Sequence, residues 1–561
     1  MQPKFVYWDK IKELEKELFR RWVCSDKELK EFIITSILIR NNKVLLVGFP
    51  GAGKSTLVRL IARGLSKDSS GMIFGMAIGA PEKTLQKVLI STNIVKLLST
   101  GEEEIVVRPI VMARIKFINE INRFSKSIQD ALLSLLEEGY LEYGGKIFRT
   151  PEYLCFADMN PFRGDMDRAL KARFLGSCYI DLPDLSGSKK IIDSLIASEV
   201  ETQSYPDLVK TMPRVLSIAE LLEIWDDVVN VKIPEDVRIF SLMIVSMFRV
   251  CKYKRGIIGY MRLKCTECEY SNEPCSFVQE PPDERANLAL LLYARARAWL
   301  HKRDYVDYSD VTWAAPYILA HRLELKPLVK SRVPNPWVLI KQTIREVIET
   351  KWITDGELGV WAESLLLACR ALGIKPLESL SSLSNFNAAK LSHMDALRRL
   401  ESSAYGEFGR GDLVVQQLYE YVKEEVASIM ANKRKILEDE YYQIIQGTGI
   451  TLSQLEDFDK KLESHPRELI RDLIEGIKRK MENFRIAFNL EAILDIAPLK
   501  KILLSYDVPV DVVEKVLDKS TNERINYMGK LIRIRRIGKN VIIMAETVDI
   551  ASEIRKTIAR I

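Results

Sequence analysis

Gly48-Phe49-Pro50-Gly51-Ala52-Gly53-Lys54-Ser55 is the stretch of sequence that decides the fold. It follows the apolar run 44–47 and leads into residues 56–62, whose apolar positions have helical spacing, so we expect a strand before it and a helix after it. The glycines allow backbone N–H groups to wrap a triphosphate at the start of that helix. Lys54 can reach the β- and γ-phosphates, and the Ser55 hydroxyl can hold Mg²⁺. We therefore predict a nucleotide site formed by Gly48, Pro50, Gly51, Ala52, Gly53, Lys54, Ser55 and Thr56.

Composition and length describe a multidomain protein without a marked charge bias. The chain has 561 residues, of which 47% are hydrophobic and 29% charged, with a net charge of +6. This length predicts about two to four domains. The charge balance argues neither for nor against nucleic acid as a partner. No basic-then-apolar leader opens the chain, and apolar runs such as residues 32–39 are too short to span a bilayer. We expect no membrane span and a cytoplasmic location.

The catalytic carboxylate is expected on a parallel strand beside the phosphate loop, where it can lie near the attacking water. Residues 115–120 fit such a strand, and Glu120 at its end is the candidate that polarises the water. Asn119 stands where an aspartate is expected. We predict that Ser55 and Asn119 hold Mg²⁺, Asn119 through a water molecule. At Asn119 the metal shell keeps an oxygen acceptor but loses the negative charge of an aspartate. The sequence therefore does not decide how tightly Mg²⁺ binds or how fast ATP is hydrolysed.

Several further motifs carry a family resemblance. Residues 119–123, followed by 129–133 and by Glu137-Glu138, resemble the MoxR branch of the AAA+ ATPases. Residues 108–110 and 154–161 extend the likeness, which covers roughly residues 5 to 325. It implies that Asn160 is a polar sensor of the γ-phosphate or of the water. Residues 140–148 alternate around a Gly-Gly turn and predict a hairpin. Hairpins of this kind mark the helix-2-insert clade, which includes the minichromosome maintenance helicases and magnesium chelatases.

The resemblance also implies catalytic arginines. Residues 169–174 match the place where the family carries an arginine finger, a cation donated to the nucleotide of the neighbouring subunit. Arg173 is the first choice and Arg168 the second, against the alternative of a surface or helix-end arginine. Residues 282–290 resemble the start of the lid helix, where Arg285 would be the second sensor arginine. Asp283-Glu284 departs modestly from the family pattern at that point.

These observations predict an α/β fold: a P-loop AAA+ parallel sheet flanked by helices, then an all-helical lid, a mostly helical C-terminal extension and a small terminal α+β unit. The expected boundaries are residues 1–184 for the nucleotide domain, 185–330 for the lid, 331–495 for the extension and 496–561 for an α-β-β-α unit. Long helical patterns at residues 413–438 and 453–487 suggest antiparallel helices or a coiled-coil arm. They would serve as a solvated spacer or as a docking arm.

The terminal unit should consist of a helix at residues 510–517, strands at 531–537 and 541–545, and a closing helix from Asp549. Its basic side chains are compatible with nucleic acid, but alternation with isoleucines is also what any half-buried strand shows. We rank a partner-binding or oligomer-capping role above nucleic acid binding. The basic side chains are Arg533, Arg535 and Arg536.

A cysteine-rich insertion at residues 251–275 lies outside the family pattern. Its four thiols, spaced C-x13-C-x2-C-x6-C, could close a tetrahedral Zn²⁺ site, because C-x2-C is a common zinc spacing. An iron–sulfur cluster, disulfides and reduced thiols are the alternatives. The four residues are Cys251, Cys265, Cys268 and Cys275.

The resemblance implies hydrolysis of ATP, with Mg²⁺, between subunits of a ring, expected to be a hexamer. The ATPase cycle would remodel or assemble a protein partner, with a protein carrying a von Willebrand factor A domain as the leading candidate. Two alternatives stay open. One is a DNA translocase resembling the minichromosome maintenance helicases, although the ATPase part has no long basic, aromatic-bearing loop. The other is a weakly hydrolysing nucleotide switch, which Asn119 would favour.

Overall fold

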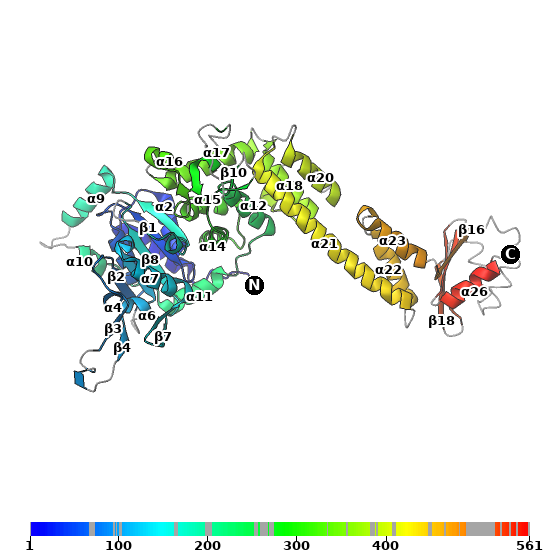
Figure 1. The fold of residues 1–561 in the computed structure, drawn as a ribbon, viewed down its shortest axis with the longest axis horizontal. Helices are drawn as coiled ribbons and strands as arrows, with labels where there is room; N and C mark the ends of the chain where they lie inside the picture. Colours follow the sequence, from blue (N-terminus) through cyan, green and yellow to red (C-terminus); the bar gives the residue numbers. More distant parts are fainter. Residues whose placement is uncertain are drawn as a thin grey trace. The chain divides into compact units, whose positions relative to one another are not determined.

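The chain forms two compact units, residues Met1–Val422 and Lys423–Ile561, in a computed structural model (Figure 1). The described residues are 2–66, 73–93, 96, 98–99, 104–161, 166–196, 205–251, 256–258, 268, 274–333, 335–354, 357–381, 388, 391–406, 411–446, 451–464, 467–481, 483–489, 522–527, 530–537, 540–545 and 548–558.

A five-stranded parallel sheet forms the centre of the first unit, in the order β2-β5-β8-β1-β9. Its strands are β1 (Lys43–Gly48), β2 (Phe74–Ile78), β5 (Ile115–Asn119), β8 (Leu154–Met159) and β9 (Gly176–Ile180). The strand expected from residues 44–47 is β1, and that from 115–120 is β5. β8 lies between β5 and β1 and pairs with both strands, and the ends of β5 and β8 both lie at the cavity of the phosphate loop.

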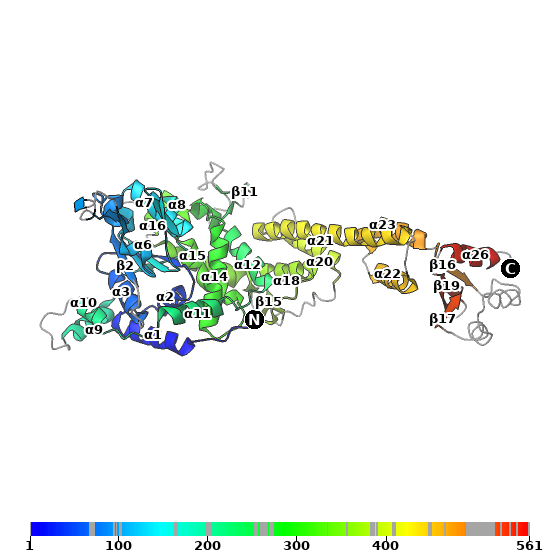
Figure 2. The same ribbon diagram turned by 90° about the horizontal axis from the view of Figure 1, so that it is seen from below.

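Helices lie on both sides of this sheet (Figure 2). Helix α3 (Lys54–Gly64) follows the phosphate loop directly, as predicted, and contacts β5 and β8. Helix α7 (Lys126–Glu138) contributes Leu132 and Leu135 to the core that also contains Leu45 and Ala157. The remaining helices of this part are α1 (Trp8–Arg21), α2 (Lys27–Ile37), α4 (Leu85–Val88), α6 (Pro109–Met112), the 3₁₀ turn η1 (Ile121–Arg123), α8 (Arg168–Lys171), α9 (Leu185–Ile196) and α10 (Tyr205–Lys210).

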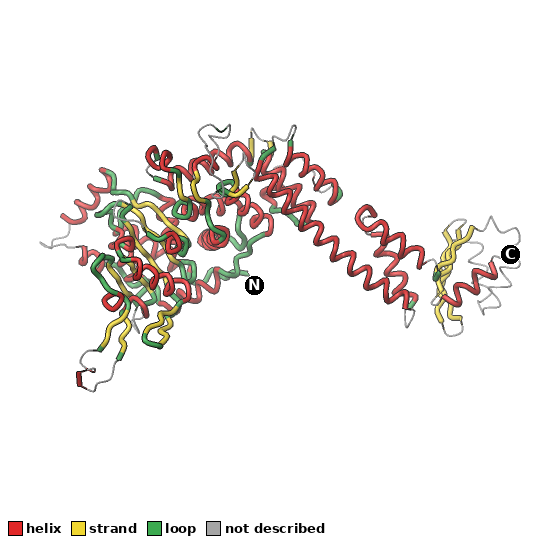
Figure 3. Tube along the Cα trace, viewed as in Figure 1, coloured by secondary structure: helices red, strands yellow, loops and turns green. Residues whose placement is uncertain are grey.

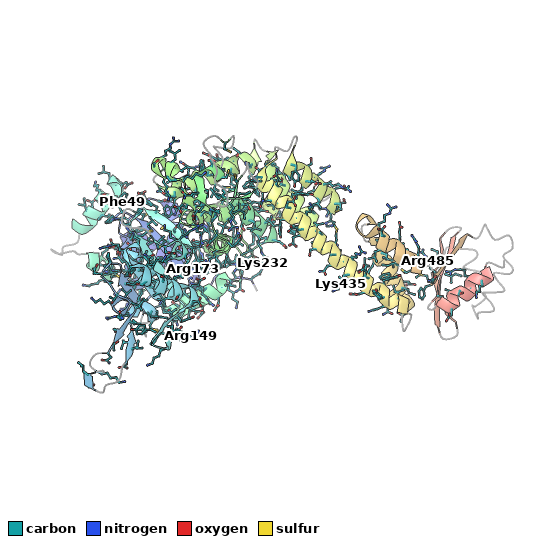
Figure 4. All side chains as sticks on the ribbon, in the orientation of Figure 1. Phe49, Arg149, Arg173, Lys232, Lys435 and Arg485 are labelled. Atoms are coloured by element: carbon teal, nitrogen blue, oxygen red, sulfur yellow. The ribbon has the colours of Figure 1, made fainter. Side chains whose placement is uncertain are left out.

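Two β-hairpins extend from the α/β part. The predicted one consists of β6 (Tyr140–Tyr143) and β7 (Lys146–Arg149), and Arg149 is labelled in Figure 4. The second, β3 (Ile90–Thr92) with β4 (Ile105–Val107), had not been predicted, since its strands are only three residues long. The hairpins are neighbours, because a Cβ on Gly144 would lie 2.9 Å from the Ile105 side chain.

The lid is helical apart from two short strand pairs, β10 (Val250–Cys251) with β11 (Gly256–Ile257) and β12 (Val278–Glu280) with β13 (Glu324–Leu325). Its helices are α11 (Ile218–Val228), α12 (Glu235–Ser246), α13 (Pro274–Phe277), α14 (Arg285–Leu300), α15 (Tyr308–Leu319) and α16 (Pro327–Arg332). The predicted lid helix is α14. Its Tyr293 stacks on Phe32 of α2 at 5.3 Å between ring centroids, which fixes the lid against the α/β part.

The rest of the first unit is mainly helical: α17 (Pro336–Lys351), α18 (Val360–Leu372), α19 (Glu378–Ser381), α20 (His393–Tyr405) and the first residues of α21 (Leu413–Gln446), with β14 (Ile353–Thr354) paired to β15 (Glu357–Leu358). The start of α17 is tied to the sheet, because the Trp337 indole donates to the Ser177 backbone oxygen in β9 at 3.0 Å.

The second unit combines helices with a four-stranded antiparallel sheet of order β16-β19-β18-β17 (Figure 3). Its elements after α21 are α22 (Leu452–Ser464), α23 (Arg467–Met481), β16 (Arg485–Asn489), β17 (Asn522–Tyr527), β18 (Lys530–Ile537), β19 (Asn540–Ala545) and α26 (Val548–Ile558). β18, β19 and α26 agree with the prediction, whereas the helix expected at 510–517 lies outside the described residues. The helical pattern of 453–487 was wrong at its end, where residues 485–487 belong to β16 and pair with β19.

Candidate nucleotide site

Backbone geometry explains the glycines of the phosphate loop. Gly51 and Gly53 have φ values of 85° and 75°, in the left-handed region that favours glycine. A Cβ on Gly48 would lie 2.2 Å from the backbone oxygen of Ile180 in β9, so a larger residue would displace the neighbouring strand. The loop can therefore bring its N–H groups to the start of α3 only with these glycines.

Lys54 lies inside the loop with only 7% of its side chain exposed. Its ammonium group donates to the backbone oxygens of Gly48 at 2.8 Å and Phe49 at 2.7 Å, and it lies 4.0 Å from Oδ2 of Asp158. Burial lowers the pKa of Lys54, and the Asp158 carboxylate opposes this shift. The loop carbonyls thus hold the cation at the floor of the loop, where a triphosphate would meet it.

A cavity of about 290 Å³ opens above the loop. Residues of the loop form one wall, and the ends of β5 and β8 form the other. The structure thus brings the predicted residues of the loop together with Asn119, Glu120 and Asn160. The lining residues are Pro50, Gly51, Ala52, Gly53, Lys54, Ser55, Thr56, Asn119, Glu120, Asp158 and Asn160.

Glu120 begins the turn that follows β5 and has a left-handed backbone, with φ 51°. Its backbone N–H donates to Oδ1 of Asp158 at 2.6 Å, which anchors this turn to β8. Its carboxylate lies on the cavity and accepts a hydrogen bond from Arg123 at 2.5 Å. A carboxylate held in this way can orient a water molecule against a bound phosphate.

Asp158 is the residue that sequence reasoning missed. It is 5% exposed, and burial raises the pKa of its carboxyl to about 6 despite the opposing hydrogen bond from Glu120 and the nearby Lys54 cation. The available signal was an acidic residue in the otherwise apolar strand Leu-Cys-Phe-Ala-Asp-Met. A carboxylate is rarely buried without a partner, so its place in a buried strand indicates a polar site.

Asn160 follows β8 and is 8% exposed. Its backbone oxygen accepts a hydrogen bond from the Asn122 side chain at 3.0 Å, which joins the ends of β5 and β8. Asn160 lines the same cavity as Lys54 and Glu120. The position suits the sensor role that the resemblance implies.

A second cavity of about 350 Å³ adjoins the first and shares Gly51, Ala52, Gly53 and Thr56 with it. Apolar side chains such as Trp22, Leu29 and Pro183 line it, and the Trp22 indole donates to the backbone oxygen of Gly53 at 3.2 Å. An apolar pocket beside a phosphate site has the character that a nucleobase requires. The sequence did not reveal it, because its walls come from residues 21–29 and 179–184 together with the separate residues Ile191 and Leu208.

The predicted arginines lie elsewhere. Arg173 and Arg285 both form ion pairs with Glu137 at the end of α7, the second at 2.8 Å. Arg168 pairs instead with Glu280. None of the three arginines lines either cavity. The structure therefore groups Arg173 with Arg285 (Figure 4 labels Arg173) and separates both from the phosphate loop of their own chain.

The cysteine insertion shows no metal centre in the described part of the chain. No group of three or more histidine, cysteine, aspartate or glutamate side chains there could hold a metal ion. Cys251, Cys268 and Cys275 form no disulfide with another described residue, whereas Cys265 lies outside the described residues. The zinc site predicted from the spacing thus has no support.

The phosphate cavity, in contrast, fits Mg²⁺ by its donor set. Ser55, Asn119, Glu120 and Asp158 all line it, and each carries a side-chain oxygen. Mg²⁺ prefers oxygen ligands and usually keeps several waters beside one or two carboxylates and the phosphates of a nucleotide. These residues therefore suit a nucleotide-bound Mg²⁺, with Ser55 as the residue nearest the start of α3.

Comparisons with known proteins agree with this geometry. Residues 43–174 match the AAA domain of the dynein-related subfamily, and residues 283–336 match the AAA lid domain. Over this region the chain resembles the MoxR family of AAA+ ATPases. The fold is that of a P-loop AAA+ module, with a parallel sheet, flanking helices and a lid.

Three curated relatives have similar coverage. The uncharacterized protein YeaC of Bacillus subtilis is 26% identical over 52% of this chain and 81% of its own length. Chaperone MoxR1 of Mycobacterium tuberculosis is 25% identical over 60% of this chain and 81% of its own length. Protein MoxR of Methylorubrum extorquens is 22% identical over 61% of this chain and 94% of its own length. A crystal structure from Cytophaga hutchinsonii, described as a candidate ATPase, aligns with a TM-score of 0.49 at 21% identity, over 61% of this chain and 95% of that one.

The two family models end before the second unit begins. The family models reach residue 336, so the AAA+ module accounts for the α/β part and the lid. Among the described residues, no helix is both long enough and apolar enough to cross a bilayer.

Proposed function

We propose that this protein hydrolyses ATP at the interfaces of a homo-oligomeric ring, expected to be a hexamer, and uses the cycle to remodel or assemble a protein partner. The observation that carries the proposal is the separation of charges. Lys54, Glu120 and Asn160 line the phosphate cavity, whereas Arg173 and Arg285 pair with Glu137 outside it. One subunit thus presents the loop, the carboxylate and the sensor, and Lys54 is the only lysine or arginine among the described residues that line the cavity.

The chemistry follows from these positions. Backbone N–H groups at the start of α3 and the Lys54 ammonium would bind the β- and γ-phosphates, and the apolar cavity beside Trp22 would hold the base. Bound Mg²⁺ would neutralise phosphate charge. Glu120 would orient the attacking water, and Asn160 would contact the γ-phosphate or that water. Negative charge spread over the transferring phosphoryl oxygens then needs a cation on the open side, for which Arg173 of a neighbouring subunit is the candidate.

A mixing experiment tests this arrangement. Arg173→Ala should lower hydrolysis by about 10³-fold while sparing nucleotide affinity, because an arginine finger acts mainly in the transition state. Chains carrying Arg173→Ala and chains carrying Lys54→Ala, each inactive alone, are combined and assayed for ATPase activity. Mixed rings contain some interfaces with an intact Lys54 and an intact Arg173, so partial activity should return. No recovery in rings shown to exchange subunits would contradict action in trans.

The nature of the partner rests on the relatives. Two of them are named MoxR or chaperone MoxR1, which favours a protein partner and a chaperone-like role. A protein with a von Willebrand factor A domain stays the leading candidate from the family resemblance, and a cytoplasmic location is part of the same proposal. Capture from cells of the source organism with Glu120→Gln, which should hold ATP, tests it. Stimulation of hydrolysis by DNA would instead favour the translocase alternative.

A further inference from the structure

The phosphate cavity is lined by a carboxylate, Asp158, that is not part of the motif at residues 119–123. Asn119 ends β5 at the position where an aspartate is expected, and an amide carries no charge to balance a divalent cation. β5 and β8 pair in parallel up to Ile118 with Ala157, so Asn119 and Asp158 are the next residues on neighbouring strands. Both line the cavity above the phosphate loop. Asp158 on β8 therefore offers a carboxylate beside Asn119, which has none.

The two oxygens of Asp158 have different surroundings. Oδ1 accepts the backbone N–H of Glu120 at 2.6 Å, which fixes the orientation of the carboxylate. Oδ2 accepts no hydrogen bond from the described residues, and the nearest cation to it is the Lys54 ammonium at 4.0 Å. The residue as a whole is 95% buried, and it lines the phosphate cavity. A buried carboxylate oxygen oriented in this way is prepared for a positive partner.

We infer that Asp158, from β8, takes the place of the aspartate that Asn119 lacks and supplies the carboxylate for the nucleotide-bound Mg²⁺, directly or through one of its waters. The inference rests on the proposed function, since it requires that the cavity binds ATP. Asp158 also spans the two halves of the site, because the same side chain touches the Glu120 turn and faces Lys54. It is thus a positioning residue for Glu120 as well as a candidate for the metal.

Metal affinity is the direct test, and Mn²⁺ is a suitable probe because its free form is read by electron paramagnetic resonance. Full-length wild type and Asp158→Asn are titrated with Mn²⁺ in the presence of a non-hydrolysable ATP analogue. Asn is isosteric and its Oδ1 can still accept from Glu120, so the fold should persist. We expect Mn²⁺ to bind roughly 10- to 100-fold more weakly. Affinity for the analogue in EDTA should stay within about threefold, because the loop and Lys54 are unchanged.

An exchange variant makes the test independent of the single substitution. Asn119→Asp combined with Asp158→Asn moves the carboxylate back to β5 and keeps the total charge. It should recover Mn²⁺ affinity to within about threefold of the wild type, since the metal gains one carboxylate from the neighbouring strand. Asp226→Asn is the matched control, because Asp226 is largely exposed and pairs with Arg40 on the surface. It should leave Mn²⁺ affinity unchanged.

The outcomes separate this inference from the proposed function. Wild type that binds no ATP analogue would contradict the proposed function itself. Wild type that binds the analogue, together with Asp158→Asn that binds Mn²⁺ equally well, would overturn the inference alone. An equal loss of analogue affinity with Mn²⁺ and with EDTA would also overturn it, because Asp158 would then act only as a counter-ion of Lys54. The inference would also be overturned if the variant with Asn119→Asp and Asp158→Asn folds, as shown by circular dichroism, but still binds Mn²⁺ weakly.

Discussion

The phosphate cavity and the cluster around Glu137 both place cations beside carboxylates, but they do so in opposite ways. Lys54 is 7% exposed and is held by carbonyls of its own loop next to Asp158. Arg285 is 46% exposed, and it shares Glu137 with Arg173 at the end of α7. The phosphate cavity therefore has its cation already in place before a ligand binds. In the Glu137 cluster, Arg285 lies at the surface, where a second molecule can reach it, whereas only 15% of the Arg173 side chain is exposed.

Lys54→Ala should have the largest effect. The cavity would lose its only lysine or arginine among the described lining residues, so we expect ATP binding to fall below detection and hydrolysis with it. Calorimetric titration with a non-hydrolysable ATP analogue measures this. Lys126→Ala is the matched control, because Lys126 is 74% exposed and pairs with Asp167 away from the cavity. Normal binding by Lys54→Ala would mean that the loop does not hold the triphosphate.

Glu120→Gln should separate binding from chemistry within the same cavity. The amide keeps the size of the side chain but cannot polarise water as the carboxylate does, so hydrolysis should fall by about 10²- to 10⁴-fold. Affinity for ATP should be retained. A steady-state phosphate-release assay with a parallel binding titration gives both quantities. Turnover at the wild-type rate would show that β5 does not carry the catalytic carboxylate.

Glu137→Gln tests the cluster that Glu137 forms with Arg173 and Arg285. The substitution removes the charge that holds Arg173 and Arg285, so both side chains should lose their orientation. We expect hydrolysis to fall by about tenfold, less than for Arg173→Ala, with unchanged affinity for ATP. Glu138→Gln, one residue further along the same helix, is the control. A loss of ATP affinity instead of turnover would place the cluster inside the nucleotide site of its own chain.

The smallest expected effect is the contribution of His321 to the pH dependence of stability. His321 contacts the segment that carries Arg173. Its ring lies between the Ser177 hydroxyl at 2.7 Å and the backbone oxygen at 2.9 Å of Phe174, the residue that follows Arg173 in the chain. Burial lowers its pKa from 6.5 to about 3. The unfolded chain therefore takes up a proton near pH 6.5, and the folded chain only near pH 3.

Stability should accordingly fall as the pH drops below 6.5, by about 1 kcal/mol between pH 6.5 and 5.5 from this group. Urea unfolding of the wild type and of His321→Gln at both pH values measures the difference. In the variant this contribution should vanish. An equal pH dependence in the two proteins would mean that the histidine is protonated in the folded state.

Much of the α/β part could be predicted because its signals are local. The phosphate loop, the strand before it and the helix after it occupy consecutive residues, and glycines with positive φ leave few alternative backbones. Residues 140–148 predict a hairpin for the same reason. In the second unit, β18 and β19 alternate clearly, whereas β16 follows directly on a helical pattern, and its pairing with β19 bridges some fifty residues of chain.

The sequence by itself predicted which residues would bind a triphosphate and which carboxylate would act on water, since these predictions depend on residue type and spacing along one segment. Only the tertiary structure decided their partners. The order β5-β8-β1 brings Asp158 between Lys54 and the Glu120 turn, and folding brings Arg173, which follows α8, and Arg285 of α14 to Glu137 of α7. Charges interact through space over a few ångströms, so their effects follow the neighbours that folding supplies.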